Sequence, residues 1–400
     1  MSTASARVMA RADELATCSE RPGEITRRYG TAALVAARDL LEGWMGAAGM
    51  TTRVDRVGNL TGTLAGDEPR PGIVIGSHFD TVIDAGRYDG TLGILLGIAC
   101  AEELRGADRA HHLTVVAFCD EEGVRFPTAY FGSRAFVAVG PEPDPALTDA
   151  GGATLGSALA IAGNAEASPA SSLPSGAVAY LEPHIEQGPV LDAGGHPLGI
   201  VTAITGGAKF AITLTGAAGH AGTVPMHLRH DPFSAAAEIA LEVERLARAD
   251  PEAVATVGQV AVAPGAANVI PGQVTMSIDA RHPDDARKAE LLAGIRSVVA
   301  AVAARRGVAA SVEVVHDERS VGCDPELAGR LRRAAVAIGL DPPSLPSGAG
   351  HDAVVLSELM PMVMLFVRCR DGISHNPAES VTAEDVAAAI AVLTAVVARG

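Results

Sequence analysis

Three consecutive carboxylates, Asp120, Glu121 and Glu122, directly follow an apolar segment of the sequence. That segment, residues 112–118 (HLTVVAF), is rich in β-branched and apolar residues and is typical of a buried strand. Acids gathered at the end of a buried strand repel one another unless a cation offsets their charge, although a solvated loop would also tolerate them. Metal binding needs only one of the two glutamates, which leaves its neighbour able to act as a general base.

A histidine and two aspartates occur at similar positions earlier in the chain. The stretch GIVIGSHFDT places His78 and Asp80 at the end of a second apolar strand. Residues i and i+2 of a strand share a face, so we expect the Asp80 carboxylate to hydrogen-bond the imidazole and hold its tautomer. Asp89 follows in the glycine-flanked turn GRYDG, which opens a helix predicted over residues 91–104.

Two further histidines, His184 in LEPHIEQGP and His375 in GISHNPAES, lie in what we interpret as loops after apolar segments. Any one of the twelve histidines is more often a surface or core residue than a ligand. Three histidines together with two carboxylates, however, match the mixed nitrogen and oxygen ligands of a pair of zinc-type ions that share one bridging carboxylate. The sequence therefore indicates a two-metal hydrolytic site.

The elements around these residues alternate between helix and strand patterns. The predicted elements of the first part of the chain are a helix over 32–48, strands over 52–57, 59–64 and 72–76, the helix 91–104 and the strand 112–118. Such alternation predicts an α/β sheet, in which ligands gather beyond the carboxyl ends of the strands. Residues 141–175, rich in Ala, Gly, Ser and Pro, are interpreted as surface helix and loop without chemistry.

A different order of elements begins near residue 207. Strands are predicted over 208–215, 255–262, 274–280 and 310–316, and helices over 231–248 and 284–306. The order β-α-β-β-α-β is the ferredoxin-like split unit. Helix and strand alternation resumes after residue 321 with 325–338, 363–367 and 383–398. We therefore expect a discontinuous α/β catalytic domain, residues 1–206 and 320–400, that carries an inserted α+β lid domain, residues 207–319.

Composition excludes several classes of partner. The 400 residues include 31 Lys and Arg against 47 Asp and Glu, a net charge of −16 that disfavours nucleic acids and acidic membrane surfaces. No apolar run reaches the roughly 18–20 residues of a membrane span. The N-terminus MSTASARVMARADEL lacks an apolar signal core, so we expect a cytoplasmic protein.

Several motifs extend these observations over nearly the whole chain. They are GSHFDTV with Asp89 eleven residues after His78, DEEGVRF followed by FGSRAF, HIEQGP, GHAGTVPM, ANVIPG with a later DAR, SGAGHDA and GISHNPAE. The chain resembles the di-zinc aminopeptidase-like metallohydrolases and, within them, the amidase/hydantoinase–carbamoylase branch. HIEQGP and GHAGTVPM are typical of this branch and are usually missing from its peptidase relatives.

The resemblance implies two divalent ions per subunit, zinc or manganese, with five ligands: His78, Asp89 as the bridge, Glu122, His184 and His375. It implies Glu121 as the general base, and Asp80 keeps the role, predicted above, of holding the His78 imidazole. On the lid, we expect His220 to stabilise the oxyanion, Asn268 to donate an amide hydrogen to the substrate, and Arg281 to grip a substrate carboxylate through two parallel hydrogen bonds, with a surface ion pair as its alternative. Outside the lid, Gln187, three residues after His184, is expected to contact the ureido end of the substrate. The resemblance also implies a homodimer formed through the lid, in which some lid residues reach the neighbouring site. Ala85 and Pro183 depart mildly from the pattern of the branch without touching a ligand position.

The activity implied is hydrolysis of the carbamoyl C–N bond of a small ureido acid, with release of ammonia and carbon dioxide. Allantoate is the first choice of substrate, because the N-terminal stretch RPGEITRRYG with the later VGNLTG is similar to allantoate amidohydrolases. An N-carbamoyl-L-amino acid is the main alternative, followed by ureidoglycolate and β-ureidopropionate. A metallo-aminopeptidase, an amino-acid deacylase, and a non-catalytic binding protein on the same scaffold are the more distant alternatives.

Overall fold

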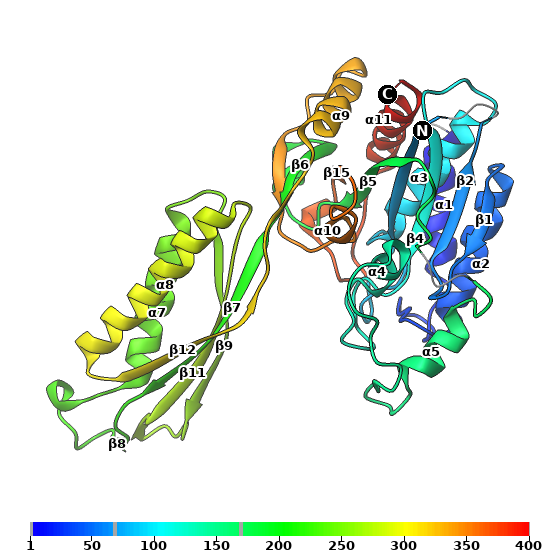
Figure 1. Cartoon of the computed structure of the whole chain (residues 1–400). Helices are drawn as coiled ribbons and strands as arrows, with labels where there is room; N and C mark the ends of the chain where they lie inside the picture. The colour runs from blue at the N-terminus through cyan, green and yellow to red at the C-terminus, as the bar shows by residue number, and fades with distance from the viewer. Residues whose placement is uncertain (1–2, 67–69, 168–170, 400) are drawn as a thin grey trace. The chain divides into compact units, whose positions relative to one another are not determined.

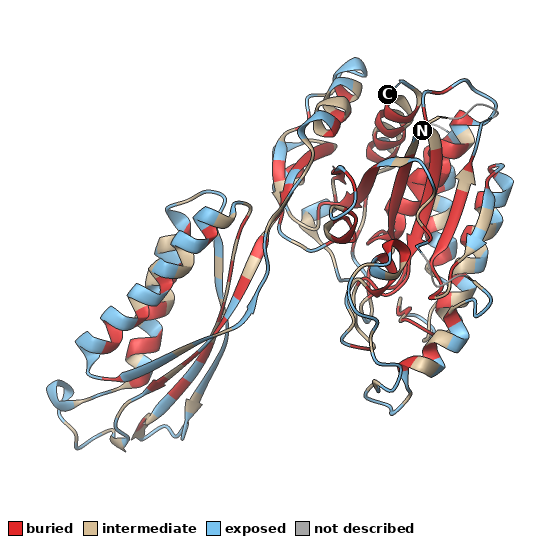
Figure 2. Cartoon of the chain, in the orientation of Figure 1, coloured by how far each residue is buried: buried red, intermediate tan, exposed pale blue. Residues whose placement is uncertain are grey.

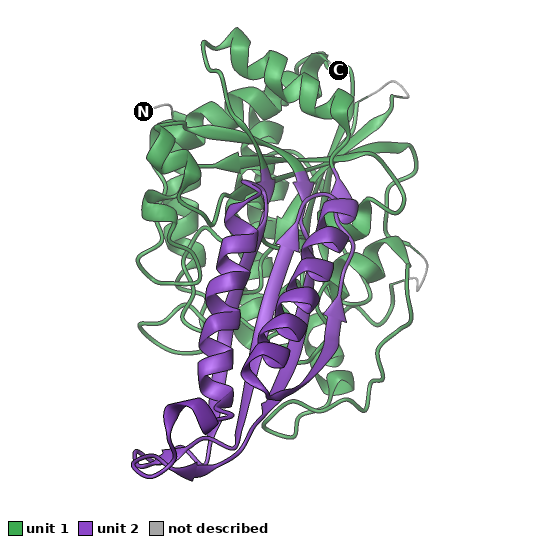
Figure 3. Cartoon of the chain, turned by 90° about the vertical axis from the view of Figure 1, so that its left-hand side faces the viewer, with its two compact units in different colours: residues 1–202, 323–345, 349–400 green, residues 203–322, 346–348 purple. Residues whose placement is uncertain are grey.

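The computed structural model describes residues 3–66, 70–167 and 171–399, and its chain divides into two compact units. Unit 1 comprises Met1–Thr202, Cys323–Leu345 and Ala349–Gly400, and unit 2 comprises Ala203–Gly322 and Pro346–Gly348 (Figure 3). The roles of catalytic domain and lid, which the sequence suggests for the two parts, stay predictions. We describe each unit by itself.

Unit 1 is built on a mixed sheet with the strand order β1-β2-β4-β3-β5-β15-β6-β13, with β14 paired to β6 (Figure 1). The strands are β1 (Thr51–Val54), β2 (Leu60–Leu64), β3 (Gly72–His78), β4 (His112–Phe118), β5 (Ala177–Ile185), β6 (Leu198–Ile204), β13 (Val321–Gly322), β14 (Ser344–Ser347) and β15 (Met362–Val367). Of these, β6 and β14 cross the boundary with unit 2, and β13 belongs to unit 2. The helices are α1 (Thr3–Leu15), α2 (Ala32–Ala47), α3 (Thr91–Leu104), α4 (Phe131–Val137), α5 (Leu155–Ala162), α6 (Val190–Gly194), α9 (Pro325–Ala337), α10 (Ala353–Leu356) and α11 (Ala383–Arg399), with a 3-10 turn η2 (Arg370–Gly372).

Four neighbouring strands of this sheet, β4, β3, β5 and β15, run parallel to one another. The register pairs His78 with Phe118 and His184 with Phe366, so the carboxyl ends of these strands meet at one edge of the sheet. Because ligands of open α/β sheets gather at that edge, the topology brings together segments that lie far apart in the sequence.

The core of unit 1 is formed by strands and helices that are apolar on more than one face. β3, β4 and β15 are almost continuously buried, as expected for strands covered on both sides (Figure 2). Helix α3 (TLGILLGIACAEEL) is buried around most of its circumference, which identifies it as a central helix rather than an amphipathic surface helix. Each fully buried Leu or Ile contributes about 1.5–3 kcal/mol through the hydrophobic effect.

Unit 2 contains β7 (Gly206–Thr215), β8 (Gly219–His220), η1 (Met226–Leu228), α7 (Pro232–Arg248), β9 (Val254–Ala263), β10 (Val269–Ile270), β11 (Gln273–His282), α8 (Asp285–Arg306) and β12 (Ala309–Asp317). Its main sheet is antiparallel with the order β12-β7-β11-β9, and β8 pairs with β10. Buried and less buried residues alternate along β7, and the buried side packs against α7 and α8. The predicted ferredoxin-like unit is confirmed, as is the α/β class of the whole chain.

The structure differs from the sequence prediction at two strand ends. The strand predicted over 52–57 ends at Val54, because the Asp55 carboxylate accepts the N–H groups of Val57, Gly58 and Asn59 and turns the chain. His184, predicted in a loop, is the penultimate residue of β5. Pairing with β15 on one side continues the strand beyond Pro183.

Residues 141–175 form α5 and connecting loops, and residues 168–170 of this segment lie outside the described residues. Leu155 and Ala158 of α5 join the core of unit 1. Among the residues that the structure describes, no helix combines the length and the apolar character that a membrane span requires.

Candidate metal centre

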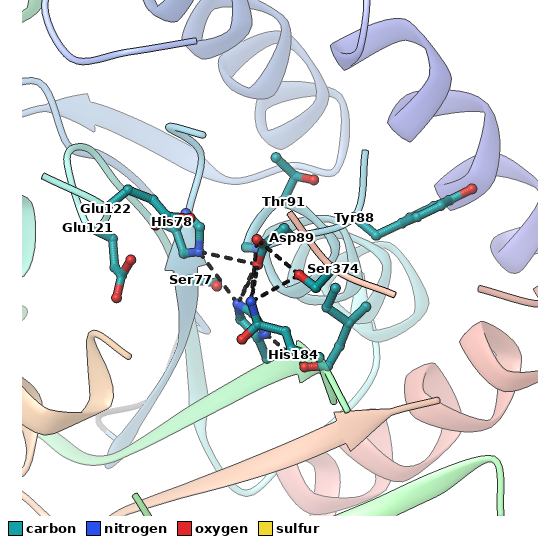
Figure 4. Close-up of polar contacts among 12 residues, drawn as sticks. Ser77, His78, Tyr88, Asp89, Thr91, Glu121, Glu122, His184 and Ser374 are labelled. Atoms are coloured by element: carbon teal, nitrogen blue, oxygen red, sulfur yellow. Dashed lines mark hydrogen bonds and ion pairs between the residues drawn. The ribbon is translucent and has the colours of Figure 1, made fainter. Parts of the chain in front are cut away.

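The carboxyl edge of the parallel strands collects five of the sequence-predicted site residues. His78 ends β3, Glu122 follows β4, His184 stands near the end of β5, Asp89 precedes α3, and His375 lies in the loop after β15. Figure 4 shows His78, Asp89 and His184 directed toward one another, with Ser374 beside Asp89. The structure thus brings together all five residues for which the sequence predicts a role as metal ligand.

One group of potential ligands consists of His78, Asp89 and His184, all buried. Asp89 Oδ1 lies 3.4 Å from His184 Nε2 and 3.9 Å from His78 Nε2. The two Nε2 atoms lie 3.5 Å apart. Ligand atoms held about 2.1 Å from one tetrahedral ion lie roughly 3.4 Å from one another, so these distances suit a single divalent cation.

A second group consists of Asp89, Glu122 and His375. His375 Nε2 lies 3.1 Å from Asp89 Oδ2 and 3.5 Å from Glu122 Oε1. Because Asp89 offers Oδ1 to the first group and Oδ2 to the second, its carboxylate has the position that a bridging ligand requires. His78, Glu121 and Glu122 form a third such group, so the geometry leaves Glu121 beside the ligands as well.

Backbone carbonyls orient two of the imidazoles. His78 Nδ1 lies 3.1 Å from the carbonyl oxygen of Asp80, and His184 Nδ1 lies 2.9 Å from that of Ile185. An N–H at Nδ1 that donates to a carbonyl leaves Nε2 with its lone pair, and both Nε2 atoms face Asp89. The two rings therefore present the atom that a metal ion would need.

Asp80 acts through different atoms from those the sequence predicted. Its Oδ1 lies 3.8 Å from His78 Nδ1, which is too long for a hydrogen bond. The carboxylate instead accepts the backbone N–H groups of Glu121 at 3.0 Å and Glu122 at 3.2 Å. Asp80 lies just beyond the end of β3, so the alternation of a strand no longer governs its side chain. It fixes the turn that carries the two glutamates and contacts the imidazole through its carbonyl.

Burial dominates the electrostatics of the acids at this edge. It raises the pKa of Glu121 well above its usual value and that of Glu122 to about 7, because a buried carboxylate loses its hydration and lies near other carboxylates. Burial by itself would lower the pKa of His78, but the carboxylates of Glu121, Asp80 and Asp89 outweigh it and raise that pKa. The site thus concentrates negative charge that a bound cation would offset.

Burial also keeps two other imidazoles neutral. It lowers the pKa of His184 to about 4 and that of His351 well below its usual value. The ring of His351 packs edge-on against His184, with the ring centroids 4.5 Å apart. A neutral imidazole is the form that binds a metal ion, so the surroundings favour His184 as a ligand.

The donor set and its spacing fit a pair of divalent cations. Three imidazole nitrogens and two carboxylates are ligands that Zn²⁺ and Mn²⁺ both accept. Of the non-glycine residues described with a positive φ, Asp120 (59°) and His375 (53°) flank this edge. Such backbone is costly for residues with a Cβ and is common where surrounding structure holds a functional group in place.

Gln187, predicted to contact the substrate, points into the same cluster. Its Nε2 lies 3.2 Å from Asp89 Oδ1, 3.1 Å from Ser374 Oγ and 3.4 Å from His375 Nε2. Its own φ is 58°. The structure thus places Gln187 beside the bridging carboxylate, and its contact with substrate stays a prediction.

The three predicted residues of unit 2 separate into two places. His220 and Asn268 are exposed neighbours, because β8 pairs with β10 and the N–H of Ala221 donates to the Asn268 carbonyl at 2.9 Å. Arg281 lies near the opposite end of β11, eight residues after Gln273, or about 26 Å along a strand. Its Nε and Nη2 bind the Asp279 carboxylate at 2.7 and 3.1 Å, and its Nη1 donates to the Gly348 carbonyl at 2.6 Å.

Sequence reasoning missed several residues at the centre. Ser374 contacts Asp89 and Glu379, and Glu379 accepts two backbone N–H groups of the Asp89 turn. Burial, with the charge of Asp89, raises the pKa of Glu379 to about 7. The motif GISHNPAE contains both residues, but only its histidine has an obvious ligand chemistry.

A buried pair of acids was missed as well. Burial raises the pKa of Glu182 to about 8 and that of Asp352 to about 7. The Glu182 carboxylate accepts the N–H of Ala353 at 2.7 Å. Glu182 sits inside an apolar strand, and an acid at such a position was the available signal.

Comparison with known proteins is consistent with this geometry. The model of "Peptidase family M20/M25/M40" matches residues 74–399. The chain is 38% identical to allantoate deiminase of Arabidopsis thaliana, over 95% of this chain and 79% of that protein. It is 39% identical to N-carbamoyl-L-amino acid amidohydrolase of Geobacillus stearothermophilus, over 97% of this chain and 96% of that protein.

Among solved structures, an amidase of the hydantoinase/carbamoylase family from Burkholderia multivorans superposes with a TM-score of 0.92. The two chains are 36% identical, and the match covers 98% of this chain and 97% of that one. The resemblance inferred from the motifs is thereby confirmed. This chain is a hydrolase of the M20/M25/M40 family and belongs to its hydantoinase/carbamoylase amidase branch.

Proposed function

We propose that this chain is a metal-dependent amidohydrolase that cleaves the carbamoyl C–N bond of a small ureido acid. The observation that carries the proposal is the cluster at the carboxyl edge of β4, β3, β5 and β15. There Asp89 presents one carboxylate oxygen to His78 and His184 and the other to His375, with Glu122 next to His375. His78, Asp89, Glu122, His184 and His375 would hold two divalent cations.

When bound, the two cations would offset the acids and make water a better proton donor. Glu121 lies beside the ligand cluster, so its carboxylate is placed to take a proton from water once the cations offset the surrounding negative charge. The resulting hydroxide adds to the carbamoyl carbon, and Glu121 passes the proton to the leaving nitrogen as the C–N bond breaks. The carbamate released decomposes to carbon dioxide and ammonia or an amine.

The residues of unit 2 would bind the substrate. Arg281 would hold its carboxylate, His220 would stabilise the oxyanion, and Asn268 would donate an amide hydrogen bond. His220 lies on β8, which pairs with β10 just before the Gln273 end of β11, whereas Arg281 lies about 26 Å along β11 from Gln273. A single unit 2 therefore does not place both side chains on one small substrate. We therefore propose a homodimer in which each site uses His220 and Asn268 from one copy and Arg281 from the other.

The relatives support carbamoyl hydrolysis more firmly than they support one substrate. Identity to the allantoate deiminase is 38% and to the N-carbamoyl-L-amino acid amidohydrolase 39%, so the similarity does not separate the two. We propose allantoate first, on the N-terminal stretch RPGEITRRYG, and an N-carbamoyl-L-amino acid second. Ureidoglycolate and β-ureidopropionate complete the set.

Ammonia release decides among these substrates. The purified chain, stripped of metal and reloaded with Mn²⁺ or Zn²⁺, is assayed with allantoate, ureidoglycolate, N-carbamoyl-L-amino acids, β-ureidopropionate, an N-acetyl amino acid and a dipeptide. We expect turnover of a ureido acid only in the presence of metal. Hydrolysis of the dipeptide or the acetylated amino acid in preference to every ureido acid would assign a peptidase or deacylase instead, and binding without turnover would indicate a non-catalytic protein.

A further inference from the structure

Glu379 is a buried acid that has no part in the reaction described above. It is 3% exposed and lies four residues after His375. The side chain of Asn376 accepts the N–H of Ala378 at 2.9 Å, and the Asn376 carbonyl accepts the N–H of Glu379 at 3.0 Å. This turn brings Glu379 back toward the segment that carries Asp89, nearly three hundred residues earlier in the chain.

One oxygen of Glu379 holds the backbone at Asp89. Oε1 accepts the N–H of Tyr88 at 2.7 Å and the N–H of Asp89 at 3.1 Å. Helix α3 starts directly afterwards at Thr91; its N-cap residue is Gly90, whose φ is 65° and which offers no side chain to cap the first turn. A buried N–H without an acceptor destabilises the fold, so the two hydrogen bonds to the carboxylate stabilise this turn.

The other oxygen reaches the Asp89 side chain through a hydroxyl. Oε2 lies 3.3 Å from Ser374 Oγ, and Ser374 Oγ lies 3.4 Å from Asp89 Oδ2. The Gln187 amide donates to the same hydroxyl oxygen at 3.1 Å. Glu379 is therefore connected to Asp89 twice, through the main chain and through Ser374.

The turn around Asp89 is shaped to admit this carboxylate. A Cβ on Gly86 would lie 2.2 Å from the carboxyl carbon of Glu379, closer than any real contact. Position 86 therefore has to be glycine for the acid to reach Tyr88 and Asp89. Gly86 and Glu379, far apart in the sequence, thus fit together beside Asp89, which belongs both to the group with His78 and His184 and to the group with Glu122 and His375.

We propose that Glu379, assisted by Ser374, is a positioning residue that sets the Asp89 carboxylate for both cations. This inference rests on the proposed two-metal function. Groups that orient a metal ligand typically change metal affinity or activity by about 10–100-fold when they are removed. The predicted consequence is weaker binding of metal by the folded chain, before any substrate is involved.

The test measures Zn²⁺ binding to the metal-stripped full-length chain by competition with a chromophoric chelator, alongside the melting temperature of the stripped chain. Variants are Glu379→Ala, Glu379→Gln and Ser374→Ala. Glu384→Gln, an exposed acid of α11, is the matched control. We expect Glu379→Ala to weaken binding of at least one ion by about 10–100-fold. Glu379→Gln should lose less, because its amide oxygen can still accept from Tyr88 and Asp89, and Glu384→Gln should bind as wild type does.

A loss of Zn²⁺ affinity that is larger in Glu379→Ala than in Glu379→Gln distinguishes a positioning role from a purely structural one. Wild-type affinity in every variant would overturn the proposal, and so would a lower melting temperature with unchanged affinity. If Glu379→Ala does not fold, the Zn²⁺ affinity of Glu379→Gln is compared with that of Glu384→Gln. Equal affinities in these two variants would overturn the proposal. A wild-type chain that binds no Zn²⁺ would refute the proposed function itself, whereas normal wild-type binding with unaffected variants refutes only this inference.

Discussion

Glu121 and Glu122 are adjacent acids to which the sequence assigns different roles, general base and metal ligand. Both follow β4, and Asp80 holds their backbone N–H groups. Of these two glutamates, only Glu122 has a described contact with His375, at 3.5 Å. Glu121 is buried beside His78. This asymmetry favours Glu122 as the ligand and Glu121 as the base.

Glu121→Gln should keep its metal and lose turnover, because a neutral amide cannot accept a proton. The expected loss in kcat is about 10²–10⁴-fold. Metal content and kcat are measured together, and Glu122→Gln serves as the paired variant, which should lose metal. Normal turnover in a fully loaded Glu121→Gln chain would move the base to another residue.

Arg281→Lys should weaken kcat/KM for a ureido acid although the charge is kept. Loss of the two-point grip on a carboxylate is worth about 1.5–3 kcal/mol, or roughly 10–100-fold. The loss should largely vanish for an analogue whose carboxylate is replaced by a neutral amide. Equal losses of kcat/KM for the acid and for the amide analogue would show that Arg281 has a structural role. Such a role would agree with the two hydrogen bonds that Arg281 donates to the Asp279 carboxylate.

At the scale of elements, the junction between β3 and α3 is closely packed. The end of β3 carries His78, and Gly90, whose φ is 65°, is the N-cap residue directly before α3. A Cβ on Gly90 would lie 2.5 Å from three atoms of the His78 ring. The helix start and the imidazole are thus packed against each other, so the local backbone determines where a predicted ligand lies.

Gly90→Ala should reduce both stability and metal affinity. The positive φ costs roughly 1 kcal/mol or more, and displacement of the His78 ring adds to it. Gly106→Ala is the matched control, because Gly106 has a φ of 74° and open space where a Cβ would lie. We expect both variants to lower the melting temperature and only Gly90→Ala to weaken Zn²⁺ binding. Equal Zn²⁺ affinity in the two variants would contradict this account.

At the scale of the whole molecule, the distribution of residues in unit 2 constrains how a site can be completed. His220 and Asn268 lie at one end of its sheet and Arg281 near the other. A small ureido acid is far shorter than that separation, so the predicted substrate contacts require two copies of the chain. Two-fold dimers satisfy such a requirement symmetrically.

Mixing two inactive variants tests this arrangement. His220→Ala and Arg281→Ala homodimers should each be nearly inactive, since every site lacks one group. A heterodimer isolated through two different tags has one intact site and should recover about half of the wild-type activity. No recovery, with heterodimer formation verified by mass, would mean that each chain supplies both residues to the same site.

The sequence by itself determined which elements form and which chemistry they carry. The run of β-branched and apolar residues predicted β4, and α3 was predicted at the residues where it occurs, because hydrophobicity and backbone propensity are properties of the local sequence. The acids after β4 and the histidines in short motifs indicated a metal site, since ligand chemistry depends on residue type. The β-α-β-β-α-β order of unit 2 was also predicted, because each of its strands and helices has a recognisable sequence pattern.

Only the tertiary structure decided which atoms meet. The Asp80 carboxylate holds the N–H groups of two glutamates rather than the imidazole, because the chain leaves β3 at His78. His184 lies within β5 because β15, nearly two hundred residues later, pairs with it. Glu379 reaches the Asp89 turn across a larger gap of 290 residues in sequence, through a space that Gly86 leaves open. Such contacts depend on parallel strand order and close packing, and these join residues that no local pattern connects.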